Sequence, residues 1–156
     1  MKKLFPLLLL TLVAGYASVT AYGQCGGGCE PTNHPKDKVK ATKTVKGAFK
    51  GFEMGDYIHA VITQANGEET SFFLPHNESV QYFLVAHKDQ PLTLTYQVVD
   101  SYIPEAGGMQ TIERLSAVKA GTSTSAAWWK KQRAGSSLSK LRKKYDAMVE
   151  QSMITR

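Results

Sequence analysis

The sequence predicts a mainly β domain followed by C-terminal helices, an α+β fold. Apolar and polar residues alternate in five segments between residues 39 and 119, which is the period of half-buried strands. One stretch with a helical period lies between the third and fourth of these segments. After Gly121 the composition changes to a basic tail whose apolar residues recur at helical spacing.

The N-terminus predicts an exported bacterial protein. Two lysines form a positive head, residues 4–13 are apolar apart from one threonine, and small residues follow, which is the order of a secretory signal peptide. The apolar run is too short to span a bilayer, which needs roughly twenty helical residues. We favour cleavage after Gly23 over cleavage after Ala21, so that residues 1–23 are the signal peptide. The remaining chain is long enough for one domain, has no later membrane-spanning segment and is expected in the periplasm or outside the cell.

A leader with the only two cysteines of the chain follows. Residues 24–38 are rich in glycine, proline and polar residues and have no apolar period, which predicts a mobile segment. Cys25 and Cys29 are separated by three glycines, and in an oxidising compartment we expect them to form a small disulfide loop. An alternative is a copper or zinc site made by both thiolates and His34, and pairing with a second chain is a third possibility. The spacing of the two cysteines resembles that of exported copper chaperones of the thioredoxin-like type.

The first strand is expected to be long and kinked. Residues 39–49 alternate, and Gly47 and Gly51 are positions where a sheet can bend sharply or bulge. A second strand is expected over residues 56–64. The Asn-Gly pair after it is a strong hairpin signal that leads into a third strand over residues 70–74.

One short helix is expected before two further strands. Asn77 can cap a helix whose apolar residues recur at helical spacing over residues 80–87. The fourth strand is expected over residues 92–98 and the fifth over about residues 109–119. The fifth is assigned from its position and flanks, because three of its apolar residues do not share one face: Ile112, Leu115 and Val118.

Residues 39–121 resemble the small OB-type barrels of exported bacterial proteins. The resemblance rests on the order strand, strand, strand, helix, strand, strand and on the glycine-bearing first strand. It implies a five-stranded barrel with one helix between strands three and four, and a ligand face over the second and third strands and nearby loops. On that face Tyr57, His59 and Phe73 would form an aromatic platform that stacks bases or sugars, with Glu105 in the loop at its edge.

A second interpretation of that face is the one we favour from the sequence. Trp128 and Trp129 are adjacent, and leaving both in water would expose a large apolar area. We therefore expect the helix that carries them to cover the platform, with His59 as a packed side chain.

The tail carries the positive charge of the chain. Residues 24–121 contain nine Lys and Arg against eleven Asp and Glu, a net charge of −2, whereas residues 122–156 contain eight against two, a net charge of +6. Helices are expected over residues 126–134 and from residue 138 onward. With about equal weight, the tail either docks on its own barrel or meets an envelope protein or anionic surface. The residues expected to contact such a partner are Trp128, Trp129, Lys130, Lys131, Arg133, Arg142, Lys143 and Lys144.

Enzymatic and nucleic-acid functions are disfavoured. The chain has no nucleophile elbow, zinc-protease motif or phosphate-cradling loop, and its carboxylates are scattered over predicted turns and strand ends. Nucleic-acid binding proteins concentrate basic residues on the reading surface, whereas this barrel is slightly acidic. We predict a non-catalytic envelope binding module without a cofactor, and as an alternative a protein that handles copper or zinc.

Overall fold

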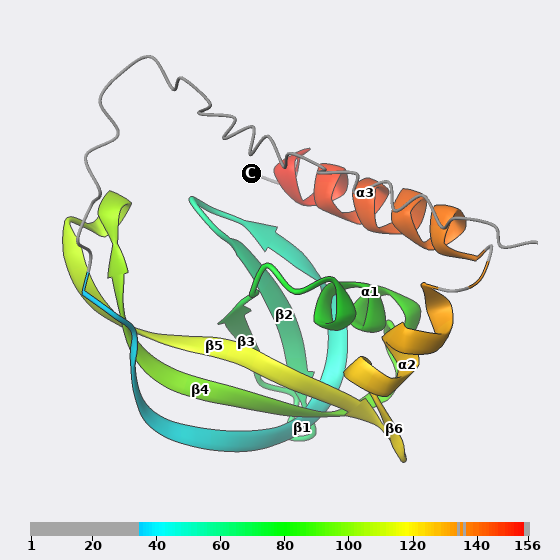
Figure 1. Ribbon diagram of the computed structural model, residues 1–156, viewed down its shortest axis with the longest axis horizontal. Helices are drawn as coiled ribbons and strands as arrows, with labels where there is room; N and C mark the ends of the chain where they lie inside the picture. The colour runs from blue at the N-terminus through cyan, green and yellow to red at the C-terminus, as the bar shows by residue number, and fades with distance from the viewer. Residues whose placement is uncertain (1–34, 134, 136, 155–156) are drawn as a thin grey trace, which may run out of the picture. The chain divides into compact units, whose positions relative to one another are not determined.

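The computed structural model describes residues 35–133, 135 and 137–154. The predicted signal peptide and the three candidate metal ligands, Cys25, Cys29 and His34, lie outside these residues. The described part is mainly β with helices at its C-terminal end, as predicted (Figure 1). None of its helices is both long and apolar enough to cross a bilayer.

Five strands form a ring that is loosely barrel-like. They are β1 (Lys38–Met54), β2 (Ile58–Gln64), β3 (Glu69–Phe73), β4 (Pro91–Ile103) and β5 (Gly108–Ala120). The order in the sheet is β3-β2-β1-β4-β5, followed by a short β6 (Ser123–Thr124) that the sequence did not predict. All neighbours are antiparallel except β3 and β5, which meet in parallel through the single pair Phe73 and Arg114. This one pair closes the ring.

Strand β1 belongs to both halves of the ring. Its first part pairs with β4 and its second part, from Gly47 onward, pairs with β2. A Cβ on Gly47 would lie 2.6 Å from the carbonyl oxygen of Thr63, so only glycine allows this close approach of the two strands. The register shifts at Lys50, which lets Phe49 and Phe52 both point into the core.

A bulge also explains the irregular pattern of β5. The register between β4 and β5 shifts so that Ser116 is the extra residue, and its hydroxyl donates to the carbonyl oxygen of Thr95 at 3.1 Å. Leu115 and Val118 are therefore both buried, although they differ in parity along the strand. The expected fifth strand is confirmed. Strand β4 is longer than expected and ends at Ile103.

The helix between β3 and β4 is α1 (Glu78–Ala86). Its N-terminus is capped by the side chain of Asn77, which accepts from the backbone N–H of Ser79 at 3.0 Å. Val80, Phe83 and Leu84 are almost completely buried in the core of the ring. The expected helix and its cap are both confirmed.

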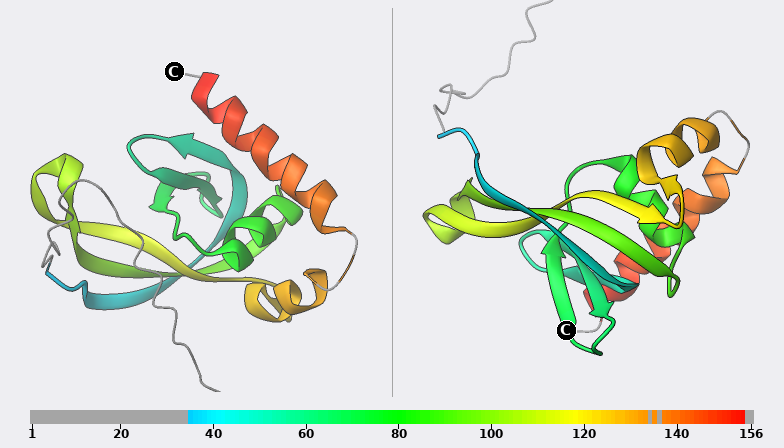
Figure 2. Two further views of the ribbon diagram at one scale, coloured as in Figure 1. Left: turned by 45° about the horizontal axis from the view of Figure 1, so that its top comes forward. Right: turned by 90° about the horizontal axis from the view of Figure 1, so that it is seen from below.

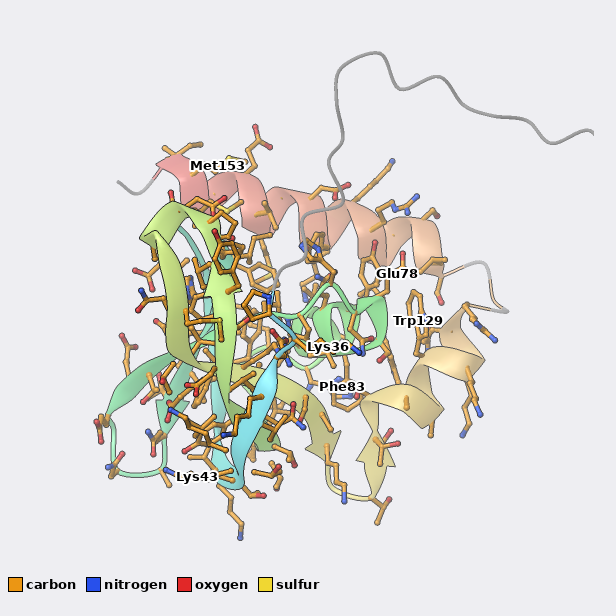
Figure 3. All side chains as sticks on the ribbon, turned by 60° about the vertical axis from the view of Figure 1, so that its left-hand side comes forward. Lys36, Lys43, Glu78, Phe83, Trp129 and Met153 are labelled. Carbon is orange, nitrogen blue, oxygen red and sulfur yellow. The ribbon has the colours of Figure 1, made fainter. Side chains whose placement is uncertain are left out.

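The tail forms α2 (Ser125–Gln132) and α3 (Leu138–Ile154), and both helices pack onto the same domain. On α2, the ring of Trp129, which is labelled in Figure 3, stacks on Tyr82 of α1 at 5.2 Å between centroids. On α3, the ring of Tyr145 meets Phe52 of β1 edge-on at 5.3 Å. Four apolar residues of α3 pack against the core: Leu141, Tyr145, Met148 and Val149. The tail therefore docks on its own domain.

Candidate functional site

The ring has an open seam between β3 and β5. The hairpin of β4 and β5 and the first part of β1 extend past the short strand β3 (Figure 2). Beyond Phe73 and Arg114 no further residues of β3 and β5 pair with each other in the described part of the chain. Pairing between the two strands is limited to this point, and Phe73 lines two hollows in the surface.

Two adjoining hollows make up what we call the seam groove. One, of about 500 Å³, is lined by Glu53, Gly55, His59, Ser71, Phe73, Thr111, Ile112 and Glu113. The other, of about 290 Å³, shares Phe73 and Ile112 with the first and is also lined by Tyr57, Tyr102 and Arg114. The groove is therefore built from residues of all five strands and of the β1–β2 connection.

A row of side chains crosses the floor of the groove from strand to strand. Glu53 of β1 lies beside His59 of β2, His59 beside Phe73 of β3, and Phe73 beside Arg114 of β5. The next residues along β2 and β3, Ala60 and Phe72, are buried in the core, so alternation directs His59 and Phe73 outward. The rings of these two residues meet edge-on with 4.4 Å between centroids.

One hydrogen bond joins the two loops at the mouth of the groove. The hydroxyl of Tyr57, in the β1–β2 connection, donates to Oε2 of Glu105 at 2.5 Å, and Glu105 lies in the 3-10 turn η1 (Pro104–Ala106) at the tip of β4 and β5. This bond lowers the pKa of Glu105 and raises the pKa of Tyr57. The ring of Tyr57 also lies 5.7 Å from Phe73. The structure thus brings together Tyr57, His59, Phe73 and Glu105, the four residues that the sequence analysis placed on this face.

Two of the positive charges near the groove, Arg114 and Lys40, are paired with carboxylates. Arg114 forms an ion pair with Asp37 at 2.6 Å, and Ser101 donates to the same carboxylate at 2.7 Å. The hydrogen bonds from Ser101 and from Arg114 lower the pKa of Asp37. Lys40 forms an ion pair with Asp100 at 2.7 Å.

The two carboxylates that line the groove, Glu53 and Glu113, form no ion pair with a lysine or arginine of the described residues. Glu53 accepts a hydrogen bond from the hydroxyl of Ser71 at 2.8 Å. The seam groove therefore combines an aromatic and apolar floor with two carboxylates that are not neutralised by protein cations.

The expectation that the tryptophan helix covers this face is wrong. Trp128 meets Phe83 edge-on at 5.4 Å and Trp129 stacks on Tyr82, so both pack on α1. The prediction that the pair is covered was right, but the surface that covers it is a helix and not the β2–β3 face. Arg142 of α3 donates to the hydroxyl of Tyr82 at 3.4 Å. The other basic residues expected to contact a partner are exposed on the tail: Lys130, Lys131, Arg133, Lys143 and Lys144.

Several groove residues were not found from the sequence. The groove forms only because β5 returns beside β3, and no local sequence pattern predicts this contact. The residues that were missed are Glu53, Ile112, Glu113 and Arg114. No group of three or more potential metal ligands occurs in the part of the chain that the structure describes. Comparison with known proteins finds no match for this chain among family models, curated proteins or solved structures.

Proposed function

We propose that this chain is an exported, non-catalytic binding module of the bacterial envelope and that it binds an envelope component in the seam groove. Export is supported by the positively charged head and the short apolar run at the N-terminus. The observation that carries the proposal is the groove itself. It is open, it presents two aromatic side chains from neighbouring strands, His59 and Phe73, and none of the residues that line it belongs to the C-terminal helices.

The ring is proposed to be an OB-type barrel. The support is its connectivity: β1 pairs with β2 and β4, β3 meets β5 in parallel, and the one helix inside the strand order lies between β3 and β4. Folds of this type bind ligands over their second and third strands and the loops after the first and fourth. The groove in this chain lies in that region, beside the loops that carry Tyr57 and Glu105.

The docked tail also favours the groove as the binding surface. Four apolar residues of α3 that could otherwise contact a partner helix or a membrane already pack against the core: Leu141, Tyr145, Met148 and Val149. The exposed lysines and arginines of the tail remain a second, purely electrostatic surface, whose contribution falls with salt.

The test is affinity capture from envelope extracts with the exported, signal-processed protein as bait. Two single variants alter the groove, His59→Ala and Phe73→Ser, and the double variant Lys143→Ala/Lys144→Ala removes two charges from the tail. We expect the groove variants to lose the captured component and the tail variant to keep it at physiological salt. Capture that is lost only with the tail variant, or that no variant reduces, would contradict a groove function. Far-UV circular dichroism of each variant establishes that it is folded.

The alternative of metal handling rests on Cys25, Cys29 and His34 and is tested separately. Freshly purified exported protein is assayed for free thiols and for bound copper and zinc. We expect an intact disulfide and no bound metal, in keeping with an oxidising compartment. Stoichiometric copper or zinc that disappears in the variant Cys25→Ser/Cys29→Ser would favour the metal-handling function instead.

A further inference from the structure

We propose that the seam groove receives an extended peptide segment with basic side chains, which adds as a strand to the open edge of β5. The inference rests on the proposed function, because it assigns a partner class to the same groove. Its separate support comes from the strand edges, from the distribution of charge and from the apolar floor.

The outer edge of β5 is available for pairing. Residues 108–113 pair with β4 on one side and, in the part of the chain that the structure describes, with no strand on the other. On the facing side of the groove, residues 69–72 of β3 pair with β2 only. In a strand with one neighbour, alternate backbone N–H and C=O groups point away from that neighbour, and they form a template for an added strand.

Comparison with another open edge of the sheet, on β1, shows that the edge of β5 lacks residues that hinder strand addition. Residues 38–46 of β1 likewise pair only with β4, but this edge carries four lysines, and Lys43 extends into solvent (Figure 3). Lysines on a free edge hinder pairing with another strand, as do prolines and bulges. Residues 108–113 contain no lysine, arginine or proline, and the bulge of β5 lies beyond them at Ser116. The chain thus blocks one open edge and leaves the other, the one inside the groove, free.

The charge of the groove selects the side chains of the partner. Glu53 and Glu113 line it without an ion pair among the described residues, while the nearby cations Arg114 and Lys40 are bound to Asp37 and Asp100. A basic side chain gains an attraction there, and an acidic one or a phosphate meets repulsion in a site partly removed from water.

The floor of the groove fits the other side chains of such a segment. Side chains of an added strand alternate between two faces, so every second one is directed toward the same side. Phe73 and Ile112 offer apolar surface to apolar or β-branched residues, and the carboxylates offer partners to lysine or arginine. The open edge of six residues corresponds to an extended peptide of about 20 Å at about 3.4 Å per residue.

The test uses three synthetic hexapeptides with blocked ends. The first alternates lysine and valine, the second alternates glutamate and valine, and the third repeats the first with every second backbone nitrogen methylated. Binding is measured by calorimetry, and the contact is located by amide hydrogen exchange. We expect the first peptide to bind and to slow the exchange of amides within residues 108–113, and the second to do neither. The third should bind at least about tenfold more weakly, because each methylated nitrogen can no longer donate a backbone hydrogen bond to β5.

Protein variants separate the contribution of charge from a general effect. The double variant Glu53→Gln/Glu113→Gln keeps the shape of both side chains and should weaken the first peptide about tenfold. The control Glu150→Gln alters an exposed carboxylate of α3 and should leave the affinity unchanged. Equal affinity for the first and third peptides, or slowed exchange at residues 38–46 instead, would overturn strand addition to β5.

The two proposals fail in different ways. If no peptide slows exchange in residues 108–113 while His59→Ala still abolishes capture from the envelope, the peptide inference is wrong and the groove function stands. A captured oligosaccharide would give this result. If the first peptide behaves as expected but no groove variant changes capture, the inference about the edge stands and the proposed function is wrong.

Discussion

The replacement of Gly47 by alanine tests the way β1 passes from one half of the ring to the other. A Cβ at this position would lie 2.6 Å from the carbonyl oxygen of Thr63 and 2.7 Å from Cγ2 of Ile62. Ordinary contact begins at about 3.4 Å, so β1 and β2 would have to separate by several tenths of an ångström. The oxygen belongs to the backbone and cannot rotate away. The close approach must therefore be relieved by moving a strand.

The change in the free energy of unfolding caused by Gly47→Ala is the sum of two opposing effects. Overpacking of this kind costs about 1–3 kcal/mol. Replacement of glycine by alanine returns up to about 1 kcal/mol, because the unfolded chain loses freedom. We expect Gly47→Ala to lower the free energy of unfolding by about 1–2 kcal/mol, and the melting temperature by about 4–8 °C at about 4 °C per kcal/mol for a domain of this size.

Gly51 provides the matched control on the same strand. No atom lies within 4 Å of a Cβ built there, and its φ is not positive, so Gly51→Ala should leave stability unchanged or raise it slightly. Both variants are measured by urea and thermal denaturation followed by circular dichroism. Equal melting temperatures for Gly47→Ala and the unaltered protein would refute the close approach. A comparable loss in Gly51→Ala would show that glycine is needed in this strand for another reason.

Two further predictions concern the tail and the mouth of the groove. Tyr145→Ala should cost about 2 kcal/mol, because it removes the ring that packs α3 on Phe52, whereas Asp146→Ala on the exposed side should change stability by no more than about 0.5 kcal/mol in urea denaturation. Equal losses would argue against docking. The pKa of Glu105 is lowered from its usual 4.5 and the pKa of Tyr57 is raised from 10.0, so their bond is complete between these pH values and is lost as pH falls through the lowered value or rises through the raised one. Amide resonances of both loops should titrate at these two ends, and Tyr57→Phe should remove the high-pH transition and shift the low-pH transition upward, because the carboxyl of Glu105 loses the hydrogen bond that lowers its pKa.

The order of the elements was predictable because it depends on local patterns. Alternation located the strands, and the cap at Asn77 marked the start of α1. For β1 and β5, the sequence did not predict which residues face the core beyond the bulges at Lys50 and Ser116, because these bulges arise from pairing with a neighbouring strand. The hydrophobicity of Trp128 and Trp129 correctly predicted that both would pack against another part of the protein. It could not predict that they pack on α1, because the hydrophobic effect is not directional and does not specify the packing partner.

The candidate site was predictable only on its β2–β3 side. His59 and Phe73 share a face because strand alternation places them there, and Tyr57 lies just before β2 with its ring 5.7 Å from Phe73. The opposite side of the groove is formed by β5, which contacts β3 through one residue pair. The periodicity of the sequence does not predict a long-range contact of this kind. The carboxylate of Glu113 therefore became part of the site only through the fold.

The groove and the C-terminal helices favour binding partners of opposite charge. The seam groove contains two carboxylates without an ion pair among the described residues, while residues 122–154 contain seven lysines and arginines against two carboxylates. A polyanion is attracted to the tail and repelled by the groove, and a basic segment experiences the reverse. The two surfaces can therefore be told apart by salt dependence combined with charge variants. Attraction between exposed charges is largely screened at distances beyond about 8 Å at physiological ionic strength, whereas backbone hydrogen bonds and apolar contacts in the groove are not. Capture that survives 0.5 M salt would belong to the groove. Capture that disappears would belong to the tail if Lys143→Ala/Lys144→Ala also reduces it at physiological salt, and to the groove carboxylates if Glu53→Gln/Glu113→Gln does.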